Sequence, residues 1–186
     1  SAISTTAGRW IVYSASPTSN TFGGLISGNK AYWGSTYSNL APNSVGLGNR
    51  YVFSSGITIT TTNVAKTYGD TPDISSSYII GGAASASAYG NAYVDVTASD
   101  ILSTLPTITS LGVDAAAVVT APTTATAAFP IEATGAVAKP GYTFTYANTG
   151  VLTVNPALVI IVKLDFDDLG FDHHLHHVDL GLHTSV

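Results

Sequence analysis

Apolar and polar residues alternate along much of this chain of 186 residues, and the alternation predicts strands rather than helices. Ile57 and Ile59 alternate with threonines, the period of two that is typical of a half-buried strand. Further strands are predicted at residues 9–16, 51–53, 78–80, 93–98, 107–110, 115–120 and 129–133. Many short strands separated by turn residues predict a mostly β fold, either a β-sandwich or one or more β-grasp-like modules.

The pattern around residue 150 predicts a β-hairpin. Tyr142, Phe144 and Tyr146 alternate with threonines, and residues 151–154 (VLTV) alternate again after the sequence Asn-Thr-Gly. Two β-branched or aromatic runs joined by a short turn with Asn and Gly favour pairing with each other. We therefore expect these runs to be neighbouring antiparallel strands.

One short helix is expected, at residues 99–105. The Ser-Asp pair at its start offers an N-cap, Ile101 and Leu105 would share one helical face, and Pro106 would end the helix.

Residues 157–162 (ALVIIV) form a continuous apolar run without alternation. A strand of this composition needs cover on both faces. We expect the run to pair with a neighbouring module or with an identical copy that accepts it as an added strand.

Charged residues make up only 9% of the chain, against about 25% in an average soluble domain. The six Lys and Arg residues are scattered singly, so nucleic acid is not an expected partner. There is no cysteine, and the longest apolar run is far shorter than the ~20 residues of a membrane span. Because the chain contains no methionine, we expect a processed product or a piece of a longer protein.

Residues 165–186 carry the whole net charge of −5 and all five histidines, because the acidic and basic residues of 1–164 cancel. Imidazoles two apart on a strand, or four apart on a helix, lie on one face and favour zinc, nickel or copper. The candidate metal ligands are Asp172, His173, His174, His176 and His177. The acidic residues also partly resemble a calcium loop, with Leu169 in one of its ligand positions. Alternatively, the tail is an ordered strand or interaction segment, or a mobile acidic terminus.

Aromatic residues are spread through the Gly-, Asn- and Ser-rich segment 17–49, notably within the loop 22–37. If exposed, Tyr32, Trp33 and Tyr37 would form a surface on which a glycan stacks; if buried, they would close one end of a β core.

The sequence does not predict an enzyme. Before residue 165 there is no histidine and a single glutamate, Glu132, so a Ser-His-Asp arrangement would have to take its histidine from the last 14 residues. No nucleophile-elbow, phosphate-loop or metalloprotease motif is present, and no bound cofactor is expected beyond the metal considered for the tail.

Three motifs follow one another along the chain: KTYGD at 66–70, VDVTASDILSTLP at 94–106 and GYTFTYANTGVLTVNPA at 141–157. They resemble the YGD-type MBG modules of filamentous-haemagglutinin-like, two-partner-secreted adhesins of Gram-negative bacteria. The segments at 8–14, 20–25 and 49–54 are similar to sequence that often precedes such modules.

The resemblance implies a β-rich leading segment at 1–56 and an MBG-like module at 57–157. The chain departs from the family's pattern at 158–186, where we expect an apolar strand and an acidic, His-rich tail. It implies a secreted protein of the bacterial cell surface, a spacer or filament building block that adds strands to its neighbours. The alternative is a binding module, for host or matrix glycans through the aromatic loop or for a metal through the tail.

Overall fold

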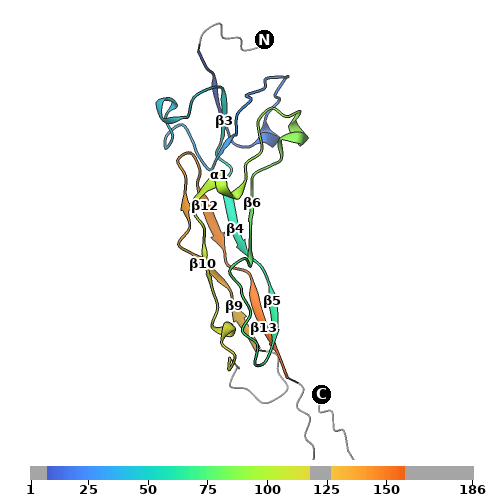
Figure 1. Cartoon of the computed structure of the whole chain (residues 1–186). Coiled ribbons are helices and arrows are strands. Elements are labelled where there is room, and N and C mark those ends of the chain that lie inside the picture. Colours follow the sequence, from blue (N-terminus) through green and yellow to red (C-terminus); the bar gives the residue numbers. More distant parts are fainter. Residues whose placement is uncertain (1–7, 118–126, 158–186) are drawn as a thin grey trace, which may run out of the picture.

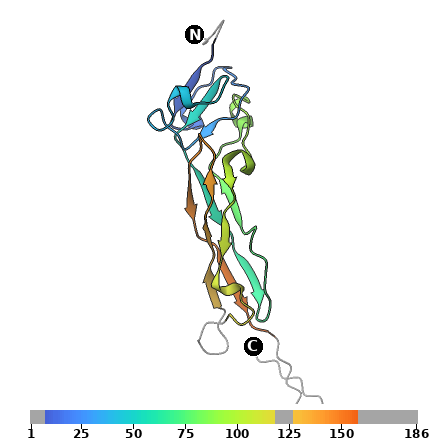
Figure 2. The same ribbon diagram turned by 60° about the vertical axis from the view of Figure 1, so that its left-hand side comes forward.

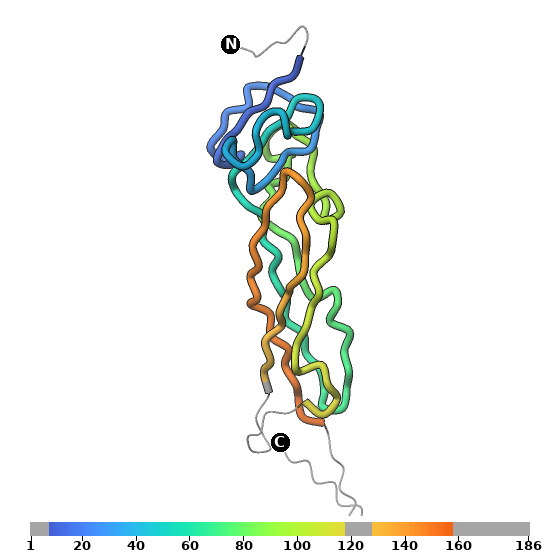
Figure 3. Tube along the Cα trace, turned by 90° about the vertical axis from the view of Figure 1, so that its left-hand side faces the viewer, coloured from blue at the N-terminus to red at the C-terminus, as the bar shows by residue number. Residues whose placement is uncertain are grey.

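The computed structural model describes residues 8–117 and 127–157. They form an elongated body, with the first described residues at one end and the last at the other (Figure 1). Figures 2 and 3 show the same narrow shape from two further sides. Thirteen short strands build this part of the chain, together with a single α-helix of four residues. The prediction of a mostly β fold of short strands with one short helix is confirmed.

The strands are two to five residues long. Their bounds are β1 Ile11–Ser14, β2 Tyr32–Trp33, β3 Arg50–Phe53, β4 Ile57–Thr61, β5 Val64–Thr67, β6 Tyr78–Gly81, β7 Leu102–Thr104, β8 Thr107–Thr109, β9 Ala127–Pro130, β10 Glu132–Thr134, β11 Val137–Ala138, β12 Phe144–Ala147 and β13 Val151–Asn155. The helix α1 spans Ala98–Ile101, and 3-10 turns cover Pro17–Ser19, Pro42–Ser44, Ala86–Tyr89 and Leu111–Val113.

A parallel sheet in the order β1-β3-β2 forms the N-terminal end of the body, which we call the head (residues 8–53). Long turns join its strands, and Arg9 fixes one of them. The Arg9 guanidinium donates hydrogen bonds to the backbone carbonyls of Pro42, Val45 and Gly46. A single cation thus satisfies three carbonyls that belong to no strand.

Two long, bent segments run side by side below the head. β4 continues into β5, and β12 continues into β13. The pairs β4–β12 and β5–β13 are both parallel. The register shifts by one residue between them, from Ile57 opposite Phe144 to Val64 opposite Leu152. The second segment therefore contains one more residue than the first at the bend.

The predicted hairpin of residues 142–154 is wrong, because β12 and β13 lie in two different sheets. The Asn-Thr-Gly sequence marks the bend between them rather than a reversal of the chain. The Asn148 side-chain oxygen accepts a hydrogen bond from the Ala133 N–H (3.0 Å), and the Gly150 N–H donates to Thr61 Oγ1 (2.8 Å). A Cβ on Gly150 would lie 2.7 Å from the Thr62 carbonyl oxygen, so the glycine is needed for the close approach of the two segments.

The remaining strands flank this central pair. β6 is antiparallel to β4 and forms an outer edge of the sheet β12-β4-β6, while β9 is antiparallel to β13. β7 and β8 pair with β11 and β10 in a further antiparallel arrangement. Ile59 of β4 belongs to the same buried cluster as Leu102 of β7 and Ala133 of β10. These strands therefore form a second layer over the sheet.

An aromatic core joins the head to the rest of the body. Trp33, Phe53 and Tyr93 are fully buried in one cluster with Ile57 and Ile59. The ring centroids of Trp33 and Phe53 are 4.9 Å apart, and those of Phe53 and Tyr93 are 5.5 Å apart. Because these residues come from both sides of position 56, the leading segment and the module that follows share one core.

The helix is shorter than expected and ends at Ile101 instead of residue 105. It begins after Thr97, whose backbone N–H and hydroxyl both donate to the Asp100 carboxylate, at 2.8 Å and 2.7 Å. From Leu102 the chain enters β7 and pairs with β11. Leu102 is buried, whereas Leu105 is 58% exposed, so the residues predicted to form one apolar face of the helix are not buried together.

Three strand predictions do not match the structure. The predicted strand 129–133 is divided between β9 and β10, which lie in different sheets. In the segment 93–98 the Val94 N–H donates to the Asn29 carbonyl (3.0 Å), and Asp95 accepts from the Ala86 N–H (2.6 Å). These hydrogen bonds to loop residues take the place of strand pairing. The segment forms only an isolated parallel β-bridge, between Val94 and Lys30. Residues 115–117 lie in and after a turn, and the rest of the predicted strand 115–120 is outside the described residues.

Candidate functional site

The three residues considered for glycan stacking do not share a surface. Trp33 is only 1% exposed and lies in the core. The Arg50 guanidinium lies over the Tyr32 ring, 4.8 Å from its centroid, and the edge of that ring meets Tyr142. Of the three, Tyr37 alone is well exposed, at 65%. A stacking surface made of all three residues is therefore not formed, because the β core takes up Trp33.

The candidate metal ligands Asp172, His173, His174, His176 and His177 lie outside the described residues, and so does the apolar run after residue 157. Within residues 8–117 and 127–157 there is no group of three or more His, Cys, Asp or Glu side chains that could bind a metal ion. The metal and calcium predictions for the tail stay predictions.

Lys66 of β5 is a buried cation near the C-terminal end of the body, 4% exposed. Its ammonium group donates to the backbone carbonyls of Asp70 (3.1 Å), Val113 (3.4 Å) and Asp114. The Asp70 carboxylate in turn accepts from the Thr67 N–H (3.1 Å). These charged groups stabilise the turn after β5 and attach it to residues 113–114, so their role here is structural.

One ion pair is found in the described part of the chain, between Lys30 of the head and Asp100 of α1. The hydrogen bond from Lys30, together with those from Thr97, lowers the pKa of Asp100 to about 2. The carboxylate therefore stays ionised under all ordinary conditions and ties the head to the helix.

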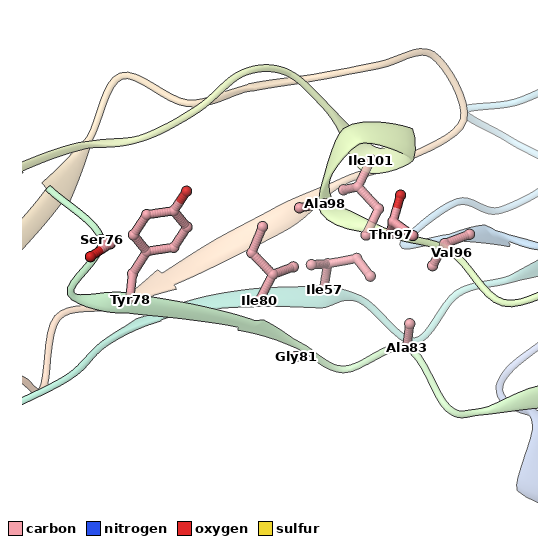
Figure 4. A pocket seen from close by; sticks show the side chains of 10 residues that line it. All are labelled: Ile57, Ser76, Tyr78, Ile80, Gly81, Ala83, Val96, Thr97, Ala98 and Ile101. Atoms are coloured by element: carbon pink, nitrogen blue, oxygen red, sulfur yellow. The ribbon is translucent and has the colours of Figure 1, made fainter.

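A groove with a volume of about 460 Å³ lies between β6 and α1 (Figure 4). Ile57 and Ile80 form its floor, while Ala98 and Ile101 of α1 line the opposite side. Thr97 and Tyr78 place hydroxyl groups at its margin. None of the lining residues is charged. The groove therefore suits an apolar or weakly polar occupant and offers no acid or base for catalysis.

One wall of the groove is an open sheet edge. The Thr62 N–H donates to the Ser77 carbonyl (2.9 Å), and β6 continues from this pair with Ile79 opposite Thr60. Hydrogen-bonded and non-hydrogen-bonded pairs alternate in an antiparallel ladder. The backbone N–H and C=O of Ile80 consequently point away from β4, along the outer edge of the sheet.

Comparison of the chain with family models, curated proteins and solved structures gave no match. No helix in the described residues is long and apolar enough to cross a membrane.

One side of this groove is predictable from the sequence, but the groove as a whole is not. The alternation in β6 places Tyr78 and Ile80 on one face, and this signal is visible in the sequence. The opposite side depends on α1 ending at Ile101, which the predicted longer helix obscured. Ala98 carries no chemical signal of its own, so only the packing of α1 over the sheet assigns it to the groove.

Proposed function

We propose that this chain is an extracellular structural module, a spacer or building block of a bacterial surface adhesin or filament. The observation that carries the proposal is the position of the two ends: the chain enters the described body at one end and leaves it at the other (Figure 1). Modules with this arrangement extend a protein when they are joined in series. The motifs at 66–70, 94–106 and 141–157 support a secreted adhesin, and the proposal assigns no catalysis to the chain.

The pairing of the strands supports a load-bearing role. β4 starts on the side of the head, and β13 ends at the opposite end of the body (Figure 3). Because the β4–β5 segment pairs in parallel with the β12–β13 segment, tension between the termini pulls the two segments in opposite directions along their length. The hydrogen bonds of both ladders are then loaded together, in shear, instead of one after another.

The head repeats this geometry. β1 pairs in parallel with β3, from Ile11 opposite Arg50 to Ser14 opposite Phe53. Tension enters at the start of β1 and leaves from the end of β3 toward β4, so this ladder is also loaded in shear. Three parallel ladders along one line of force (β1–β3, β4–β12 and β5–β13) suit a module that must resist extension.

Single-molecule pulling tests the proposal. The chain contains no cysteine, so cysteines placed at chosen sites give unique attachment points. One variant has attachments at residues 8 and 157, which load the ladders in shear. Its matched control has them at Thr58 and Thr145, register partners in β4 and β12, which opens the same ladder from one end.

We expect a clearly higher rupture force for the terminal attachments than for the Thr58–Thr145 attachments at the same loading rate. Equal forces, or a lower force for terminal pulling, would contradict a load-bearing role. Protein carrying both cysteines is reduced before coupling, because the two register partners are close enough to form a disulfide.

A further inference from the structure

We propose that the groove beside β6 is an acceptor site for residues 157–162 of a second copy of this chain, which add to the open edge of β6 as a strand. The inference rests on the proposed function, since it concerns how modules of this kind join. It adds the acceptor site, the donated segment and the residues that recognise it.

The edge of β6 provides the backbone contacts. Ile80 directs its N–H and C=O outward, and Ile79 on the other face of the strand is 58% exposed. An open strand edge is a template for pairing with another extended segment. An added strand would therefore form main-chain hydrogen bonds with β6 and extend the sheet β12-β4-β6 by one strand.

The groove provides the side-chain contacts. Successive side chains of a strand point to opposite faces, so every second residue of an added strand would point into the space between β6 and α1. The volume of about 460 Å³ lies in the range that holds a drug-sized ligand, and so has room for aliphatic side chains. Ile57, Ile80 and Ile101 give this space an apolar floor and wall (Figure 4).

The composition of residues 157–162 matches the groove. The run ALVIIV contains no charged and no polar side chain, and the groove contains no charged residue that such a run would leave unpaired. A strand without alternation needs cover on its faces. The groove would cover one of the two faces of the run.

The reach of the chain favours a second copy. β13 ends at Asn155, opposite Thr67 of β5. Ile80 lies opposite Ile59 of β4, eight positions before Thr67, which corresponds to about 26 Å along extended chain. Residue 160, in the middle of the run, can lie at most about 18 Å from Asn155. The run therefore cannot centre on Ile80 of its own chain, whereas a second copy can place it there.

A charge placed in the groove tests the proposal. Ala98 is exposed and lines the groove, and its neighbour Ser99 is exposed but does not line it. We would compare the full chain with the variants Ala98→Glu and Ser99→Glu by light scattering over a range of concentrations. We expect concentration-dependent association of the unchanged chain and of Ser99→Glu. Ala98→Glu should associate at least about tenfold more weakly, because pairing would bury an unpaired carboxylate.

A cross-linking experiment identifies the segment that binds. Two single-cysteine variants, Ala98→Cys and Ile160→Cys, are mixed under mild oxidation, and the mixed disulfide dimer is measured by mass. We expect this dimer in clear excess over the dimer formed when Ser99→Cys replaces Ala98→Cys. A chain that stays monomeric at all concentrations, equal association of the two glutamate variants, or equal yields of the two dimers would overturn the proposal. The pulling experiment on single modules does not depend on any of these outcomes, so it separates a failure of this proposal from a failure of the proposed function.

Discussion

Replacing Gly34 with alanine should destabilise the protein where the head meets the body. Gly34 follows β2 with a φ of +75°, a conformation that residues with a Cβ rarely adopt. Its N–H donates to the Ser55 carbonyl (2.8 Å), and its carbonyl accepts from the Thr143 hydroxyl (2.7 Å). A Cβ at this position would lie 2.8 Å from the Thr143 backbone oxygen, closer than real Cβ atoms approach.

Two costs add up in the Gly34→Ala variant. The left-handed conformation costs about 1–2 kcal/mol for an alanine. Forcing a methyl group against a backbone atom, which cannot rotate away, costs a further ~1–3 kcal/mol by comparison with overpacked cores. The free energy of unfolding should therefore fall by about 2–5 kcal/mol, a large part of the 5–15 kcal/mol that is typical of a domain.

Gly28→Ala is the matched control. Gly28 also has a positive φ, of +65°, but a Cβ there would meet no atom within 4 Å. This variant carries only the conformational cost, so the difference between the two variants measures the steric cost of the contact with Thr143. Urea unfolding followed by tryptophan fluorescence gives both midpoints, and we expect the lower one for Gly34→Ala with an unchanged m-value. Equal midpoints would refute the close approach of Gly34 and Thr143.

Three further variants test other parts of the structure. Lys66→Met should lower the free energy of unfolding by about 2 kcal/mol or more in urea melts, because it removes the buried donor that three backbone carbonyls share. Lys139→Met, at an exposed site, should change the free energy of unfolding by less than about 0.5 kcal/mol. Asp100→Asn should lower the free energy of unfolding at pH 6, and this free energy should then fall less steeply in acid. Because the folded-state pKa of Asp100 is about 2, its ionised carboxylate stabilises the fold above about pH 4, and this contribution is lost as the pH falls toward 2. Ile59→Ala should cost about 2–5 kcal/mol in a thermal or urea melt and Ile79→Ala much less, since Ile59 is fully buried and Ile79 is 58% exposed.

Local alternation predicted strands well where a strand has one buried face. Ile57 and Ile59 are buried, whereas Thr58 and Thr60 are only partly buried, as the period of two requires. The same pattern did not reveal the partner of a strand. Phe144 pairs in parallel with Ile57, far away in the sequence, and no local signal separates this arrangement from a hairpin with residues 151–154. The Asn-Thr-Gly sequence is compatible with a reversal of the chain and with a bend, and tertiary contacts decide between them.

The candidate site was less predictable than the fold. The groove arises between β6 and α1, so it depends on two elements whose relative position is set by the core around Ile101. Aromatic residues in a polar loop were a misleading signal, because burial of Trp33 depends on packing against Phe53 and Tyr93. Trp33, a glycan-stacking candidate from the sequence, lies in the core, and the groove is lined by residues without conspicuous chemistry.

The surroundings of Arg9 and Lys66 determine how their contribution to stability depends on salt. Both cations are neutralised by carbonyl dipoles at hydrogen-bond distance instead of by carboxylates. Dissolved ions screen interactions between separated charges in water, but they have little effect on a cation enclosed by dipoles at contact. The contribution of these two cations to the melting temperature should therefore be the same in dilute and in saline surroundings.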